Sequence, residues 1–240
     1  MATSPPRRTR PGVFTRDAAV RCVLVFITLA AAGCASLPAS RADPYVERVE
    51  LLALLQTLNA DLLSHDSATL TLERWCADHR LAEPARIVAR RVRDVTKPVP
   101  DDLRALLKVD AGEPIGYRHV QLMCGVHVFS EADNWYVPRR LTADMNQRLD
   151  STDEPFGKVV QPLHFQRRTL SAELLWSPLP PGWEMSGAQA TAAGDRSAVR
   201  IPDSVLRHRA VLVDSAQQPF SAVVETYTKQ LFDFGPWQSH

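Results

Sequence analysis

Two charged residues lie inside otherwise apolar segments, and they are the first candidates for chemistry. Residues 116–129 alternate as a β-strand does, and Arg118 falls on the face that carries the apolar side chains. Glu225 falls within residues 219–228, a strand-like stretch that is apolar on both faces. Because an unpaired buried charge is strongly unfavourable, each of the two residues needs a partner of opposite sign.

Two interpretations of this pair are open. Arg118 and Glu225 can pair with each other as a purely structural bridge. Alternatively, Arg118 holds the carboxylate of a ligand and Glu225 handles a proton beside it. The second interpretation uses the fixed fork of a guanidinium, which binds a carboxylate through two hydrogen bonds in a way that lysine cannot.

The rest of the chain predicts the elements that position these residues. Leucine and valine spacing predicts two helices between Pro44 and His79, separated by a capping turn at residues 65–67. Strand-like and short helical stretches follow, and a long surface loop is expected over residues 177–203. The predicted strands cover residues 85–95, 117–129, 134–137, 158–176 and 207–231, with a hairpin turn at 130–133, and short helices cover 101–108 and 143–150. Helices followed by an antiparallel sheet indicate the α+β class.

Composition excludes several classes of protein. The 240 residues carry 28 Lys and Arg against 27 Asp and Glu, so a strongly basic nucleic-acid-binding protein is disfavoured. The seven histidines are scattered without metal-ligand spacing, and we therefore expect no metal site. No phosphate-binding loop and no serine-hydrolase motif is present in the sequence. We expect a single domain that acts as a monomer.

The first 43 residues have the pattern of an export signal rather than of a fold. An arginine-rich stretch precedes the apolar run Cys22–Ala32, which is about half the ~20 residues that a membrane-spanning helix needs. The sequence Ala-Ala-Gly-Cys at 31–34 resembles the lipobox of bacterial lipoproteins, in which the cysteine is lipidated. An ordinary cleaved signal with an incidental cysteine is the alternative.

The lipobox resemblance implies the organisation of the chain. Residues 1–33 would be the signal peptide, residues 34–43 a tether lipidated at Cys34, and residues 44–240 the folded domain. The implied location is the bacterial cell envelope, attached to a membrane through the lipid. Ala35, rather than an aspartate, follows the cysteine, which in that family favours the outer membrane over the inner membrane.

Four segments resemble, in order, the bacterial chorismate lyases, which are the chorismate–pyruvate lyases of ubiquinone synthesis. Together the segments span about residues 62–231, most of the domain. They are the Asp-Ser-Ala-Thr turn at 66–69, the Tyr-Arg-His-Val-Gln-Leu strand at 117–122, the Glu-Pro-Phe-Gly-Lys turn at 154–158, and the run from 207 to 225 that ends in Val-Val-Glu.

This resemblance implies a fold, a reaction and a site. The fold would be α+β, with a single antiparallel sheet and a ligand cavity closed by short helical flaps. The reaction would eliminate pyruvate from chorismate, or from a related enolpyruvyl ether, to leave 4-hydroxybenzoate without any cofactor. Arg118 would bind a substrate carboxylate, and Glu225 would act as general acid at the ether or ring hydroxyl. Phe156 and Ala68 would contact the ligand through their backbones, and Gly157 would allow a close approach.

The sequence also departs from that family. His208 replaces the second arginine of the family's Arg-Arg-Ser pattern, and the 177–203 loop is an insertion. Chorismate is a cytoplasmic metabolite, whereas this chain carries an export signal. The alternatives are therefore an enzyme for another exported compound, a non-catalytic envelope lipoprotein that binds a small aromatic carboxylate in the same pocket, or a chain that stays inside the cell.

Two further features leave alternatives open. Cys76 and Cys124 are the thiols left after processing and lipidation, and they either form a disulfide or stay as two buried thiols. A basic cluster lies within residues 86–93 and is either a solvated strand edge or a wall that guides an anionic substrate. Its members are Arg86, Arg90, Arg91 and Arg93.

Overall fold

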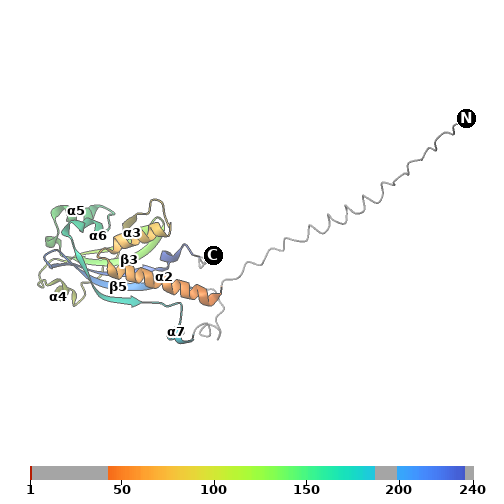
Figure 1. Ribbon diagram of the computed structural model, residues 1–240. Coiled ribbons are helices and arrows are strands. Elements are labelled where there is room, and N and C mark those ends of the chain that lie inside the picture. The colour runs from red at the N-terminus through yellow and green to blue at the C-terminus, as the bar shows by residue number, and fades with distance from the viewer. Residues whose placement is uncertain (2–42, 187–198, 236–240) are drawn as a thin grey trace. The chain divides into compact units, whose positions relative to one another are not determined.

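The computed structural model describes residues 1, 43–186 and 199–235, and those from 43 onward belong to one compact unit (Figure 1). The predicted signal peptide, the lipidation site Cys34 and nearly all of the tether lie outside the described residues. So does the central part of the predicted 177–203 loop, residues 187–198.

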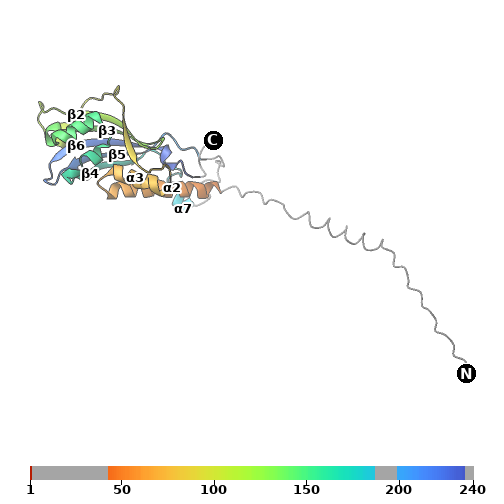
Figure 2. The same cartoon turned by 90° about the horizontal axis from the view of Figure 1, so that it is seen from above.

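One antiparallel sheet of six strands forms the centre of this unit, in the order β1-β2-β3-β6-β5-β4. Figure 2 shows the strands from β2 to β4 in that succession. The fold is therefore α+β with a single antiparallel sheet, as predicted. The strands are β1 (Ile87–Arg91), β2 (Gly116–Cys124), β3 (His127–Tyr136), β4 (Gln166–Leu174), β5 (Ser204–Val213) and β6 (Pro219–Thr228).

Most of the predicted strands are confirmed, but the hairpin turn at residues 130–133 is wrong. β3 continues through these residues, and the turn lies between Cys124 and His127, which are paired. Gly125 makes this turn with a φ of 56°, in the left-handed region that glycine favours. The polar run at 130–133 forms a strand because β3 is central and bonds to both β2 and β6. The predicted strand over residues 158–176 begins only at Gln166.

Side-chain caps mark the starts of the two long N-terminal helices. Asp43 caps α2 by accepting a hydrogen bond from Tyr45 N–H, and Ser67 caps α3 in the same way through Leu70 N–H. The helices are α2 (Pro44–Ser64), α3 (Ala68–Asp78), α4 (Leu103–Leu107), α5 (Ala143–Ser151), α6 (Phe156–Val159) and α7 (Trp183–Ser186). Single 3-10 turns lie at Pro138–Arg140, Gln161–Leu163 and Lys229–Phe232.

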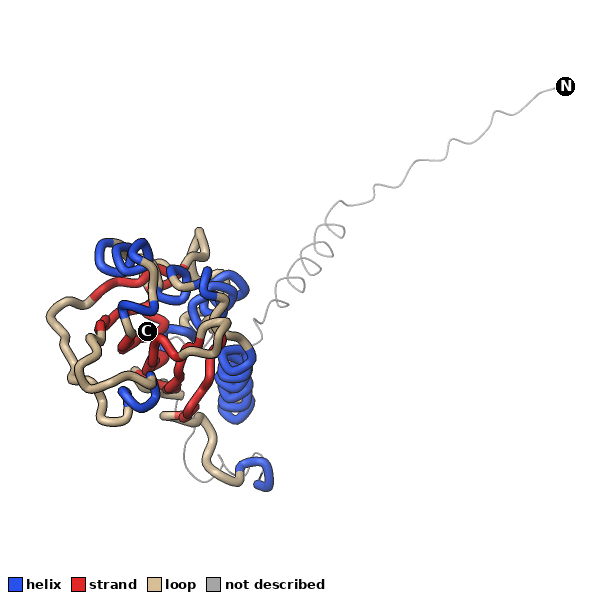
Figure 3. Tube along the Cα trace, turned by 90° about the vertical axis from the view of Figure 1, so that its left-hand side faces the viewer, coloured by secondary structure: helices blue, strands red, loops and turns tan. Residues whose placement is uncertain are grey.

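The helices cover the two faces of the sheet unequally. α2 and α3 pack against one face, where four leucines of α2 at three-to-four spacing are completely buried. α5 and α6 extend that layer over Tyr136 and Phe220. α4 packs on the opposite face, against Trp135 and Ala222. Figure 3 shows most of the helices gathered on one side of the strands and mainly loops on the other. Within the described residues, no helix is both long and apolar enough to cross a membrane.

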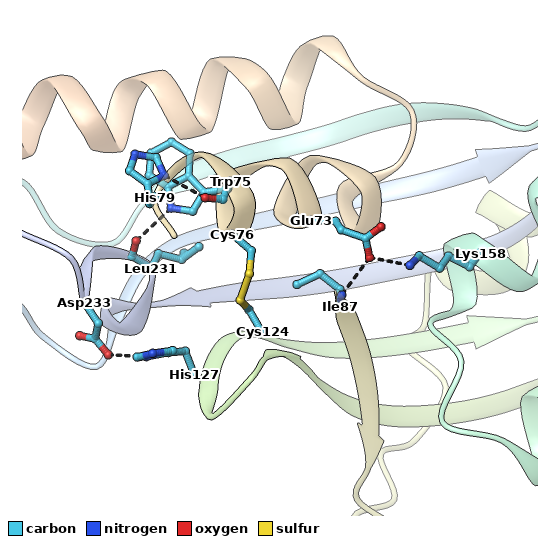
Figure 4. Close-up of a disulfide and its surroundings, with 10 residues drawn as sticks. All are labelled: Glu73, Trp75, Cys76, His79, Ile87, Cys124, His127, Lys158, Leu231 and Asp233. Carbon is cyan, nitrogen blue, oxygen red and sulfur yellow. Dashed lines mark hydrogen bonds and ion pairs between the residues drawn. A yellow bond between two sulfur atoms is a disulfide. The ribbon is translucent and has the colours of Figure 1, made fainter. Parts of the chain in front are cut away.

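A disulfide fastens α3 to β2. Cys76 and Cys124 are bonded, with a Cα–Cα distance of 6.3 Å, which decides between the two alternatives left open by the sequence (Figure 4). Beside this bridge, Glu73 accepts hydrogen bonds from Lys158 Nζ at 2.5 Å and from Ile87 N–H at 2.9 Å. These contacts link α3 to α6, β1 and β2.

Candidate functional site

A cavity of about 530 Å³ lies between the helix-covered face of the sheet and the segments that close it. The sheet contributes its floor, and the start of α3, the start of α6 and Phe165 form its walls. All five residues that the sequence analysis assigned to the site line this one cavity, although they come from four separate segments. They are Ala68, Arg118, Phe156, Gly157 and Glu225.

Arg118 is the unusual member of the cavity wall. Its side chain points to the helix-covered face, as the alternation of β2 predicted, and it is only 1% exposed. None of its three guanidinium nitrogens has a hydrogen-bond partner among the described residues. Burial lowers the pKa of Arg118, and the nearby positive charge of Arg91 lowers it further. Arginine nevertheless stays protonated in proteins, so this cavity wall carries a buried positive charge without an ion-pair partner in the described part of the chain.

Glu225 does not pair with Arg118, and the interpretation of the two as a structural bridge is wrong. Its Oε2 atom lies 2.5 Å from Nη2 of Arg167, and both side chains are almost fully buried. The hydroxyl of Tyr227 donates to the same oxygen at 3.0 Å. Oε1 of Glu225 makes no hydrogen bond within the described part of the chain, and it is not sealed from solvent. One carboxylate oxygen is therefore fixed and the other remains free to accept from a ligand.

Arg167 is the site residue that the sequence analysis missed. Burial lowers its pKa, but the Glu225 carboxylate outweighs that effect and raises the pKa overall. Its backbone N–H donates to Asp66 Oδ1 at 2.8 Å, which ties the start of β4 to the turn before α3. The sequence did hold a signal for a buried arginine at this position. Arg167 and Arg168 are neighbours in β4, and neighbouring side chains of a strand point to opposite faces, so one of the two must face inward. Which of the two does so depends on the register with β5.

The turn at Phe156 and Gly157 brings α6 close to the start of α3. A Cβ on Gly157 would lie 3.2 Å from both Ser67 Oγ and Thr69 Oγ1, so a larger residue would push the two segments apart. The ring of Phe156 packs against Tyr136, with centroids 5.6 Å apart. Gly157 therefore lets α6 approach the start of α3 closely, whereas its predicted role toward a ligand stays a prediction.

His208 lies next to the ion pair, opposite Glu225 in the register of β5 and β6. It is completely buried, its Nε2 lies 2.9 Å from Asn59 Oδ1, and its Nδ1 has no partner among the described residues. Burial lowers the pKa of His208 to about 4, so it is neutral near pH 7. The position at which this sequence departs from the Arg-Arg-Ser pattern of chorismate lyases thus carries no charge near pH 7, and Arg167 supplies the cation that neutralises Glu225.

The donor groups of the described residues do not gather as metal ligands do. No group of three or more His, Cys, Asp or Glu side chains is placed to hold a metal ion in residues 43–186 and 199–235.

Comparison with known proteins places the chain in a family. No family model matches the sequence. The chain is 54% identical over 190 residues to the uncharacterized protein y4mC of Sinorhizobium fredii, across 79% of each chain, and it belongs to the same family.

Solved structures with a similar trace are distant in sequence. The effector domain of PhnF from Mycobacterium smegmatis matches with 13% identity and a TM-score of 0.43, covering 68% of this chain and 89% of that domain. The longer PhnF structure gives 14% identity and a TM-score of 0.44, with 69% of this chain and 64% of that chain covered. A GntR-family transcriptional regulator from Enterococcus faecalis matches with 13% identity and a TM-score of 0.39, and the match covers 61% of this chain and 97% of that chain.

Proposed function

We propose that the cavity binds a small organic carboxylate and that Arg118 holds it. The observation that carries this proposal is a guanidinium 1% exposed, without a partner among the described residues, at the wall of a cavity of about 530 Å³. A buried, unpaired charge destabilises a fold unless a ligand supplies its counter-ion. A carboxylate matches the geometry of a guanidinium through two parallel hydrogen bonds.

The remaining walls define the rest of this ligand. Apolar side chains line the floor and suit a ring or an enolpyruvyl group; they are Val120, Leu122, Leu212 and Val223. Oε1 of Glu225 accepts hydrogen bonds, so the ligand carries a donor such as a hydroxyl at that wall. A small hydroxylated aromatic carboxylate has both features, which agrees with the expectation from the chorismate lyase resemblance.

Binding without catalysis is the function that this geometry supports best. A general acid must give a proton to the leaving oxygen. Glu225 instead accepts two hydrogen bonds on Oε2, one of them from the permanent cation Arg167. This arrangement supports a role for Glu225 as a hydrogen-bond acceptor for the ligand rather than as an acid that gives it a proton.

Elimination of pyruvate from chorismate, without any cofactor, is the second candidate function. The observation in its favour is the free Oε1 of Glu225 at the same cavity as Arg118. In this case the residues would exclude water and hold the substrate, and Glu225 would have to be protonated before the enolpyruvyl oxygen departs.

Calorimetry with the purified full-length chain tests the binding proposal. We expect 4-hydroxybenzoate to bind, and the substitution Arg118→Met to weaken binding by about 100-fold or more, as loss of a buried charge pair does. Arg90→Met is the matched control, because Arg90 is exposed on β1 and bonds only to Gln121. Equal binding by the wild type and Arg118→Met would refute the role of Arg118.

Incubation with chorismate separates the two candidate functions. Release of pyruvate by the wild type that is lost in Glu225→Gln, with 4-hydroxybenzoate binding retained, would establish the lyase. Binding without pyruvate release would establish the non-catalytic function.

We also propose that the chain is exported and anchored through a lipid on Cys34. The lipobox resemblance supports this location. The Cys76–Cys124 disulfide supports it as well, because disulfides persist mainly in oxidising compartments. Cell fractionation should find the wild type with membranes and Cys34→Ser in the soluble fraction; an unchanged distribution would refute the anchor.

A further inference from the structure

A second cavity, of about 490 Å³, opens at the β1 edge of the sheet. The ladder between β1 and β2 ends where Arg91 pairs with Val120. One more backbone hydrogen bond follows, from Val92 N–H to the carbonyl of His119, and the chain then leaves β2. The cavity lies between the departing segment and β2. It is lined by residues 91–93, 95 and 96 on one side and residues 117–119 on the other.

The residues that line this edge cavity are basic or neutral, and none of them is acidic. Arg93 is exposed and makes no hydrogen bond or ion pair within the described residues. Arg91 donates to the backbone carbonyl of Asp150 at 3.2 Å and lies 3.9 Å from that residue's carboxylate. Its charge also reaches Arg118, whose pKa it lowers in addition to the effect of burial. Arg91 and Arg93 therefore give the lining of the edge cavity a cationic character.

His119 is held in a defined orientation at the same cavity. Asp133, which is 8% exposed, accepts from its Nδ1 at 2.8 Å, from Tyr117 Oη at 2.7 Å and from Lys97 Nζ at 2.5 Å. Burial raises the pKa of Asp133, but these hydrogen bonds outweigh it and lower the pKa overall. An ionised carboxylate only accepts, so Nδ1 of His119 carries the hydrogen.

The other ring nitrogen of His119 is available. Nε2 makes no hydrogen bond with any described residue, and it is not among the buried polar atoms that lack a partner, so solvent reaches it. The hydrogen bond to the buried carboxylate fixes the orientation of the imidazole and leaves its other nitrogen at the cavity. The same arrangement orients histidine side chains in ligand-binding sites.

The geometry points to a second binding site at this edge, for a small tetrahedral oxyanion such as a phosphate group, either free or in an ester. Arg91 and Arg93 supply guanidinium groups and Thr96 supplies a hydroxyl, and these donors suit the acceptor oxygens and negative charge of a phosphate. With its hydrogen on Nδ1, His119 offers Nε2 as an acceptor, which suits the P–OH group of a singly protonated phosphate. This site is independent of the proposed carboxylate site, although Arg118 borders both cavities.

Phosphorus NMR and calorimetry with the full-length chain test this inference, using inorganic phosphate and phenyl phosphate as probes. We expect at least one probe to bind. Arg93→Gln should weaken binding by about 10-fold through loss of a charge-assisted hydrogen bond, and His119→Asn by about 3-fold through loss of a neutral acceptor. The double variant Arg91→Gln/Arg93→Gln should abolish binding. The preference between the probes tells a free phosphate from an ester.

The matched control is Arg90→Gln. Arg90 is the neighbour of Arg91 on β1, but it does not line the edge cavity. It should bind the probes as the wild type does. Thermal unfolding of each variant identifies any failure to fold. Arg93→Gln should fold normally, because Arg93 is exposed to solvent. The inference is overturned if neither probe binds, if Arg90→Gln loses as much affinity as Arg93→Gln, or if 4-hydroxybenzoate competes with the probes.

Discussion

Two arginines line the same cavity, and they are held in opposite ways. Arg167 is neutralised by Glu225, which Tyr227 also contacts, so its charge belongs to a buried ion pair, although its Nε has no hydrogen-bond partner among the described residues. Arg118 is buried as deeply but has no counter-ion among the described residues. A buried charge with a counter-ion is compatible with a stable fold, whereas a lone buried charge opposes it. The difference separates a residue that shapes the cavity from one that is kept for a ligand.

Breaking the paired arginine should have the largest effect on stability. Glu225→Gln would leave Arg167 as a second buried charge without a counter-ion, and we expect the free energy of unfolding to fall by about 3–5 kcal/mol. Urea denaturation measures this change. Glu173→Gln is the control, because Glu173 forms an exposed bridge to Arg207 at 3.8 Å and should change stability by about 1 kcal/mol or less. Similar losses in both variants would contradict the contrast between the arginines.

Removing the disulfide tests what holds β2, the strand that carries the unpaired Arg118, in place. Cys124 lies on the same face of β2 as Arg118, and its bond to Cys76 closes a loop with a sequence separation of 48. For a loop of this length, chain entropy predicts that Cys76→Ala/Cys124→Ala loses about 4 kcal/mol of unfolding free energy. Urea denaturation of the wild type under reducing conditions should reproduce the loss. No change in either experiment would show that packing alone holds β2.

Acid should lower the free energy of unfolding through His208, the neutral residue beside the Arg167–Glu225 ion pair. The pKa of His208 is lowered by burial from 6.5 to about 4 in the folded chain. Between these values the unfolded state binds more protons, so stability is present above pH 6.5 and decreases as the pH falls towards 4. The loss is about 3 kcal/mol from pH 7 to pH 4. His208→Gln should remove this part of the slope in urea denaturation at pH 7 and pH 4.5, and an unchanged slope would contradict the assignment.

Removing the unpaired arginine should stabilise the chain, in contrast to breaking the pair. Arg118→Met replaces a buried charge by an apolar side chain of similar length, and we expect a gain of about 1–3 kcal/mol in the absence of ligand. The same variant should lose 4-hydroxybenzoate binding, so stability and function change in opposite directions. A loss of stability in urea denaturation would mean that Arg118 has a counter-ion in the free protein.

Alternation and capping patterns predicted much of the fold and of the site. The inward direction of Arg118, the two N-terminal helices and the single antiparallel sheet follow from local spacing, which survives folding because one face of each element is buried. The hairpin turn was misplaced because the segment from Ser130 to Asp133 is mostly polar, a composition that also occurs in a central strand bonded to a neighbour on each side. Arg167 was missed because inward and outward arginines alternate there without any local difference.

By itself, the sequence of this protein determined that Arg118 and Glu225 are chemically out of place, and the chorismate lyase resemblance added Ala68, Phe156 and Gly157 to the predicted site. Only the tertiary structure decided which charges meet. Arg167, 58 positions from Glu225, becomes its partner through the register of β4, β5 and β6, and Arg118 is left without one. Parity along a strand is a local property, whereas the pairing of charges depends on contacts between strands that are distant in the chain.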